Sequence, residues 1–192
     1  MSETSDGRRH AMLAALILAI GLTRLSTLLP EPMPDATLAA LFLAGFYVLT
    51  LSSFVGLGCA VAAADWLALE GGVDSSCVTP GYLLLFAGYF LVWRAGLWAG
   101  RLPNPVMPRT VAQSLAALTV AVALAFVLSN LGFFAFSDAA QEMDPFAYLL
   151  AVSGYLPGYG GAALFYTVPV LAVGWLSQVG GVPRDAAPDT RA

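Results

Sequence analysis

Apolar runs of about 20 residues recur along this sequence, separated by short breaks rich in Pro, Gly and charged residues. A helix of that length and composition can cross a hydrocarbon core of roughly 30 Å. Of the 192 residues, 59% are hydrophobic and only 10% are charged, whereas a soluble domain carries about 25% charged residues. The sequence therefore predicts an all-α protein that crosses a lipid bilayer several times.

The breaks divide the chain into six predicted helices. We expect these helices over residues 10–29, 37–52, 55–70, 80–99, 110–134 and 157–178. The stretch "PFAYLLAVSGY" predicts an extra amphipathic segment at the interface before the last helix. Because no small-residue cleavage site follows the first apolar run, we expect the first helix to be retained. The polar ends 1–9 and 179–192 predict disordered cytoplasmic tails flanking one domain over 10–178.

Arginine placement predicts the orientation of the helices. With six spans and a cytoplasmic N-terminus, seven of the eight arginines lie on the cytoplasmic side, and Arg24 is the exception. Acidic residues near positions 31–35, 70–74 and 138–144 then lie on the outer side. Five or seven spans would scatter the arginines across both sides. The sequence therefore predicts six spans with both termini in the cytoplasm.

The two cysteines fall in different predicted environments. Cys59, in "GLGCAVAAA", is interpreted as a small packing residue near the cytoplasmic start of the third helix. Cys77, in "DSSCVTPGY", lies in an outer loop. The third helix rises about 16 Å from Cys59 to Glu70, so the two thiols lie beyond the reach of a disulfide. Cys77 is therefore either a loop thiol without a role or an unpaired thiolate donor for a transition metal.

One thiol cannot build a zinc or iron–sulfur site by itself. The sole histidine, His10, is predicted on the opposite side of the membrane. A metal bound by Cys77 must therefore arrive with its other ligands already supplied, as in a corrinoid.

Two ionisable residues are predicted at membrane depth. Asp65 lies in the outer half of the third helix, and Arg24 lies at a similar depth in the first. An ionised group at such a depth costs on the order of 2.5–3.5 kcal/mol on insertion scales. A pair between Arg24 and Asp65, facing a cavity, would relieve both. The alternative is that Arg24 extends outward to the interface and Asp65 caps a local turn.

Polar and aromatic residues gather at the predicted outer end. Asn130, in "VLSNLGFF", either bonds a neighbouring helix or lines a pocket. Tyr82, Tyr155 and Tyr159 lie at the same level, where an aromatic belt is the ordinary explanation. "SGYLPGYGG" is rich in Gly and Pro, however, and non-helical backbone at membrane depth is tolerated where it lines a cavity. These residues therefore predict one external cavity mouth.

The first helix carries alanines at four-residue spacing: Ala11, Ala15 and Ala19. A stripe of small residues lets another helix approach closely, so it is a candidate docking surface. The sequence has no P-loop, zinc-protease motif, Cys-x-x-Cys or nucleophile elbow. We therefore expect no ATP hydrolysis by this chain and no nucleic-acid partner.

These features resemble the substrate-binding S components of energy-coupling factor (ECF) transporters. The resemblance rests on six helices, the alanine stripe, the Pro-rich first loop "LLPEPMPDAT" and an external pocket. Within that group the sequence looks like the BtuM family of bacterial cobalamin transporters. The matching features are the lone cysteine ahead of "TPGY", the aspartate at the end of the third helix, and "SNLGFF" before "YLPGYGG".

The resemblance implies a multi-pass protein of the bacterial inner membrane that takes up cobalamin or a related corrinoid. In that family the corresponding cysteine binds the cobalt of cobalamin and supports removal of its cyanide, which implies these roles for Cys77. It also implies that substrate contacts come from a further set of residues: Arg24, Asp65, Tyr82, Asn130, Tyr155 and Tyr159. Cobalamin would be cargo rather than a prosthetic group, and an ECF energising module is the expected protein partner.

Three alternatives stay open at the level of sequence. The first is an S component for another vitamin-sized substrate, in which Cys77 is incidental. The second is a membrane enzyme whose external thiol does redox or dealkylation chemistry. Only Asp74, Tyr82 and Asp65 could assist a thiol there, which weakens this option. The third is a scaffold that only packs against other membrane proteins.

Overall fold

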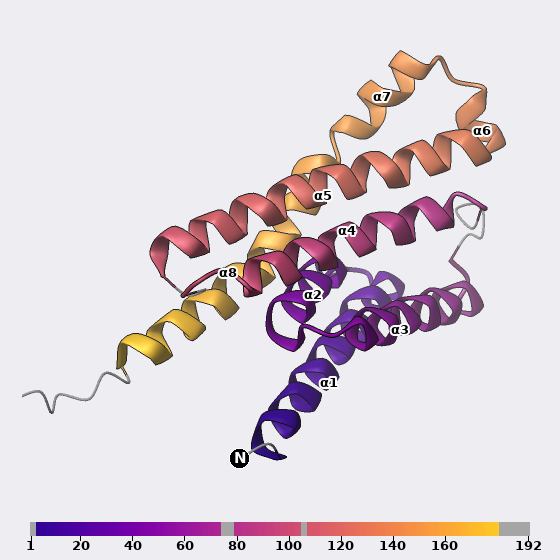
Figure 1. Ribbon diagram of the computed structural model, residues 1–192. Coiled ribbons are helices and arrows are strands. Elements are labelled where there is room, and N and C mark those ends of the chain that lie inside the picture. The colour runs from indigo at the N-terminus through magenta and orange to yellow at the C-terminus, as the bar shows by residue number, and fades with distance from the viewer. Residues whose placement is uncertain (1–2, 74–78, 105–106, 181–192) are drawn as a thin grey trace, which may run out of the picture.

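Every regular element of the described chain is helical (Figure 1). The computed structural model describes residues 3–73, 79–104 and 107–180. Cys77 and the tail from residue 181 lie outside this part. The structure therefore shows the helices and the cavity between them, and it does not test the predicted role of Cys77.

Within the described residues, five helical segments are long and apolar enough to cross a membrane. They are α1 (Glu3–Leu25), α3 (Leu51–Glu70), α4 (Tyr82–Gly100), α5 (Pro108–Phe136) and α8 (Leu156–Gly180), the last joined to the short helix α7 (Pro145–Ser153). The predicted multi-pass helical architecture is confirmed by these segments. Short helices complete the fold: η1 (Ser26–Leu28) and α6 (Asp138–Gln141).

The second predicted helix differs from the expectation of a span over 37–52. It consists of α2 (Thr37–Leu43) followed directly by the π-helical turn η2 (Ala44–Val48). The helix ends at Val48 because Leu49 adopts a left-handed conformation, with φ 62°. At 1.5 Å per residue this helix is about 18 Å long, shorter than a hydrocarbon core of about 30 Å. The described chain therefore combines five long helices with one short central helix.

This short helix lies at the centre of the bundle (Figure 1). Nearly all its side chains are buried, because α1, α3, α4 and α8 all pack around it. Two glycines permit the contact with α4. A Cβ on Gly45 would overlap the carbonyl oxygen of Trp93, and a Cβ on Gly96 would overlap that of Phe42. Backbone-to-backbone packing of this kind is how small residues bring membrane helices together.

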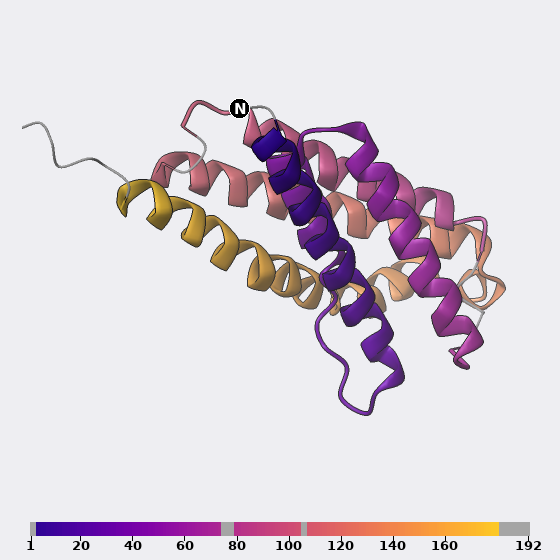
Figure 2. The same ribbon diagram turned by 90° about the horizontal axis from the view of Figure 1, so that it is seen from below.

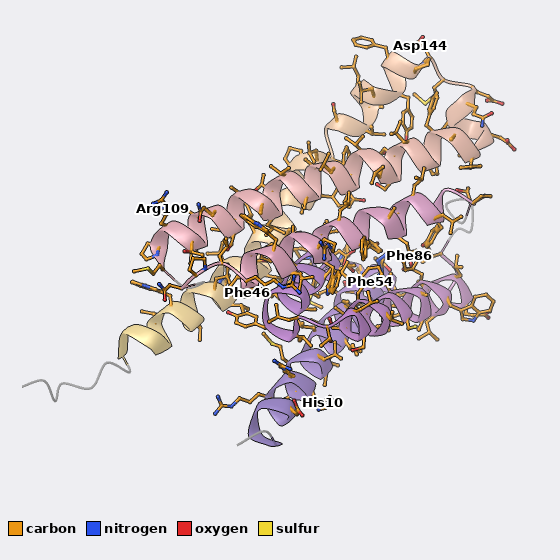
Figure 3. All side chains as sticks on the ribbon, in the orientation of Figure 1. His10, Phe46, Phe54, Phe86, Arg109 and Asp144 are labelled. Atoms are coloured by element: carbon orange, nitrogen blue, oxygen red, sulfur yellow. The ribbon has the colours of Figure 1, made fainter. Side chains whose placement is uncertain are left out.

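The helix directions bring the start of α1, the α4–α5 turn and the end of α8 to one end of the molecule (Figures 1 and 2). The α3–α4 connection, α6 and α7 lie at the opposite end. His10 and Arg109 mark the first end and Asp144 the second (Figure 3). This arrangement is compatible with the predicted placement of both termini on one side of the membrane, and the identity of that side remains a prediction.

Three local expectations need correction. Residues 3–9 belong to α1 rather than to a disordered tail, since a helix nucleated by the apolar run extends easily through residues without proline. "LPGYGG" is helical, and the break before α8 is limited to the turn at Gly154 and Tyr155. Cys59 is exposed, because the buried stripe of α3 follows other positions: Ser53, Leu57, Val61, Ala64 and Ala68.

Candidate functional site

A cavity of about 730 Å³ opens in the half of the bundle that contains the α3–α4 connection. Its wall is formed by the loop before α2, the first turns of α4 and α8, and the C-terminal part of α5. Helical periodicity explains the contribution of each helix. On α4 the lining residues are Tyr82, Leu85 and Tyr89, and on α8 they are Gly158, Tyr159 and Ala162. Residues spaced by three and four positions share one helix face.

Five residues proposed from the sequence as substrate contacts line this cavity. They are Arg24, Tyr82, Asn130, Tyr155 and Tyr159. Asp65 contacts Arg24 and Tyr82 from behind the wall. Cys77 lies outside the described residues, so the structure does not show its relation to the cavity. The tertiary fold thus brings together residues from α1, α4, α5 and the α7–α8 turn.

Arg24 is the centre of the polar network. Its Nε donates to Asp65 Oδ1 at 2.8 Å, which confirms the predicted pair. The two side chains are only 15% and 20% exposed. An ion pair in such surroundings is held by its hydrogen bonds as well as by its charges, since each charge has lost most of its water. The pair therefore accounts for both ionisable residues at membrane depth.

The remaining nitrogens of Arg24 also meet protein oxygens. Nη1 lies 3.5 Å from Asp35 Oδ2 and 3.5 Å from Thr37 Oγ1. Nη2 lies 3.5 Å from Tyr89 Oη. All three guanidinium nitrogens thus lie near protein oxygens, Nε in a short hydrogen bond and Nη1 and Nη2 at the longer distance of 3.5 Å.

Asp65 and Asp35 have different roles around this arginine. Both oxygens of Asp65 are used, because Oδ2 accepts from Tyr82 Oη at 2.8 Å. Asp35 is 45% exposed and its Oδ1 accepts from the first residue of α2, from Thr37 N at 2.8 Å and Thr37 Oγ1 at 2.6 Å. Asp35 lines the cavity. It is therefore the carboxylate that an incoming ligand would meet.

Asp35, Thr37 and Tyr89 are members of the network that sequence reasoning missed. Tyr89 could have been found, because it follows Tyr82 by seven positions and so shares its helix face. Asp35 precedes Thr37 in a pattern typical of a helix start. Its approach to Arg24 depends on the fold of the 29–36 loop, which local sequence does not specify.

Asn130 combines the two roles considered for it. It lines the cavity, its Nδ2 donates to Phe126 O at 2.8 Å, and its Oδ1 accepts from Tyr148 Oη at 3.2 Å. Tyr148 is buried and its ring lies 4.9 Å from that of Phe134. The Asn130–Tyr148 contact therefore fastens α7 to α5, beside the cavity.

Aromatic rings form the more open part of the wall. Tyr155 and Tyr159 are 67% and 50% exposed, and the ring of Tyr159 lies 5.5 Å from that of Phe126 in an edge-to-face arrangement. Exposed rings of this kind offer flat apolar surface together with a hydroxyl. This part of the wall can stack against a ring system of a ligand.

We expect Tyr82→Phe to lower the free energy of unfolding by about 1.5–3 kcal/mol, the usual contribution of a hydrogen bond to a charged group. The substitution removes the donor to Asp65 Oδ2 and keeps the ring. Tyr155→Phe is the matched control, because it removes a hydroxyl from an exposed ring. Chemical unfolding in detergent micelles measures both. Equal stability of the two variants would show that water replaces the Tyr82 hydroxyl without loss.

The alanines of α1 lie apart from the cavity wall. Ala11 and Ala15 are exposed and Ala19 is partly buried, so the first two present a small-residue surface to the surroundings. No group of three or more His, Cys, Asp or Glu residues that could hold a metal ion occurs in the described part of the chain.

Comparisons with known proteins leave this site as the basis for assigning a function. No protein-family model matches the sequence, and a search of curated proteins gives no match.

Proposed function

We propose that this protein is a membrane transport component that binds a vitamin-sized solute in the cavity, with a corrinoid as the leading candidate. The observation that carries the proposal is a cavity of about 730 Å³ lined by aromatic, apolar and a few polar side chains. Ligand pockets typically measure about 300–1,000 Å³ and have this mixture of linings. The scaffold alternative is weaker, because a buried Arg–Asp pair beside a cavity adds nothing to simple helix packing.

The corrinoid assignment rests on the resemblance to the BtuM family and on the position of Cys77 in the sequence. Cys77 precedes Thr79 by two positions, and Thr79, Gly81 and Tyr82 all line the cavity. A thiolate donor this close in sequence to residues of the wall supports cobalt as the metal of the ligand, since the other ligands of cobalt come with the corrin ring. The exposed tyrosines would contact the ring and its amide side chains.

Membrane orientation and partners follow as parts of the same proposal. The arginine distribution favours the end with the α4–α5 turn as cytoplasmic, which puts the cavity at the external face of a bacterial inner membrane. The exposed Ala11 and Ala15 would offer α1 to an ECF energising module. Transport by the chain alone is the alternative.

Enzymatic use of Cys77 has less support. A catalytic thiol needs a neighbouring base or acid. The candidates Asp65 and Tyr82 are bonded to each other, and Asp65 also to Arg24. Thiolate-assisted removal of cyanide from cyanocobalamin needs no such base, because a donor on cobalt weakens the bond to the opposite axial ligand and cyanide departs as the anion.

The test is the visible absorption spectrum of purified protein incubated with cyanocobalamin. We expect a spectral change and release of cyanide with the parent protein, and neither with Cys77→Ser, because serine lacks the soft sulfur donor. The change should strengthen as pH rises through the titration range of a thiol, since the bond requires the thiolate.

Cys59→Ser is the matched control for this experiment. Cys59 is exposed on α3 and does not line the cavity, so its substitution should leave the spectrum and cyanide release unchanged. An unchanged spectrum in Cys77→Ser would show that Cys77 is incidental, and the corrinoid assignment would then lose its main support.

A further inference from the structure

The charges at the cavity wall do not balance. Among the described residues that line the cavity, Arg24 and Asp35 are the charged ones, and Asp65 pairs with Arg24 from behind. One guanidinium therefore faces two carboxylates, which leaves an excess of one negative charge. Glu31, exposed in the adjoining loop, has the same sign. The excess lies in a partly enclosed space, where charges are screened less than on an open surface.

The guanidinium of Arg24, the kind of group that usually binds an anion, already has protein oxygens around it. Arg24 is the basic residue of the wall, and each of its three nitrogens already faces a protein oxygen. An anionic ligand would have to displace Asp65 to reach Nε, and it would come close to Asp35 on reaching Nη1. In either case a carboxylate would remain beside the new anion. Anion binding at the cavity therefore opposes the existing pairs.

We propose that the cavity selects ligands whose net charge is zero or positive and discriminates against ligands with a net negative charge. This inference rests on the proposed function only in that the cavity is a ligand site, and it applies whether or not the ligand is a corrinoid. Asp35 is the selecting residue. Because Asp35 lines the cavity and is 45% exposed, a ligand cation or hydrogen-bond donor can reach it. Its Oδ2 also lies 3.5 Å from Arg24 Nη1. Asp65, with both oxygens used, fixes Arg24 in place.

Asp35→Asn isolates this role. Asparagine keeps a carbonyl oxygen to accept from Thr37 N and Oγ1, so both hydrogen bonds at the start of α2 are retained. The substitution removes the excess charge, leaving Arg24 balanced by Asp65. Asp144→Asn is the matched control, because Asp144 Oδ1 also accepts from backbone N–H groups at the start of a helix, those of Phe146 and Ala147, and Asp144 does not line the cavity. Figure 3 shows Asp144 at the loop ahead of α7.

Two ligand series measure the selection in purified protein by equilibrium binding. The first pairs cyanocobalamin with its monocarboxylic acid, in which one peripheral amide is hydrolysed. The second compares tryptamine, N-acetyltryptamine and indole-3-propionate. All three contain the indole ring system, and they carry a positive, zero and negative charge, respectively. We expect the anionic member of each series to bind about fivefold more weakly than the neutral one, the effect of a unit charge at about 4 Å in water-like surroundings. Asp35→Asn should remove that difference, and Asp144→Asn should preserve it.

The outcomes separate this inference from the corrinoid assignment. If the indole series follows the expected order while neither corrinoid binds, the charge selection holds and the corrinoid assignment fails. If an anionic member binds as tightly as its neutral counterpart in either series, or if Asp35→Asn and Asp144→Asn behave alike, the selection is overturned. Binding of no member of either series overturns it as well, together with the cavity as a ligand site.

Discussion

Arg24→Gln is expected to lower the free energy of unfolding by about 3–5 kcal/mol, the range for removing one partner of a buried ion pair. The variant leaves Asp35 and Asp65 near each other without a cation. Asp65→Asn should cost less, because Arg24 keeps Asp35 at 3.5 Å. The double substitution should cost less than the sum of the two single ones, since it removes both charges of the Arg24–Asp65 pair and leaves neither of them without its partner. Unfolding in micelles, followed by tryptophan fluorescence, measures all three.

Arg94→Gln is the matched control for the arginine. Arg94 is exposed on α4 and forms no ion pair within residues 3–73, 79–104 and 107–180. Its substitution should change stability by less than about 0.5 kcal/mol, as is usual for a surface position. Additive effects of Arg24→Gln and Asp65→Asn, or effects as small as that of Arg94→Gln, would contradict a coupled pair and favour outward extension of Arg24.

Gly96→Ala is expected to be the most damaging single-methyl substitution in the chain. The new Cβ would overlap the carbonyl oxygen of Phe42, so α2 and α4 must move apart. Overpacking costs typically about 1–3 kcal/mol and occasionally more, and the upper part of this range applies where the obstacle is backbone. Asp35 lies just before α2, and Thr37 is the first residue of α2. Displacement of α2 should therefore also weaken ligand binding in the cavity. Thermal unfolding and equilibrium binding of the same preparation test both effects.

Gly56→Ala provides the control for this glycine. Gly56 lies within α3, and nothing lies within 4 Å of a Cβ added there. Alanine is favoured over glycine in a helix by roughly 0.8–1 kcal/mol, so this variant should be as stable as the parent or more so. A Gly96→Ala protein with parental stability would mean that α2 and α4 are not in backbone contact.

The sequence by itself determined that the chain is helical and crosses a membrane, because apolar run length is a local property that hydrocarbon thickness interprets directly. It also predicted the Arg24–Asp65 pair, since two isolated charges at equal depth have few other ways to be neutralised. The gathering of Tyr82, Asn130, Tyr155 and Tyr159 at one end followed from their depth along successive helices.

Tertiary structure alone decided the length of the second helix and the membership of the polar network. Residues 37–52 carry no charge, and the apolar run passes from Leu38 through Leu49 without a polar break, so hydropathy cannot reveal that the helix ends at Val48. That end depends on Leu49 turning left-handed and on glycine contacts with α4. Asp35 likewise meets Arg24 only because the loop before α2 folds back over α1. Such contacts join residues on different elements, whereas a periodic pattern or a residue spacing in the sequence describes only one element at a time.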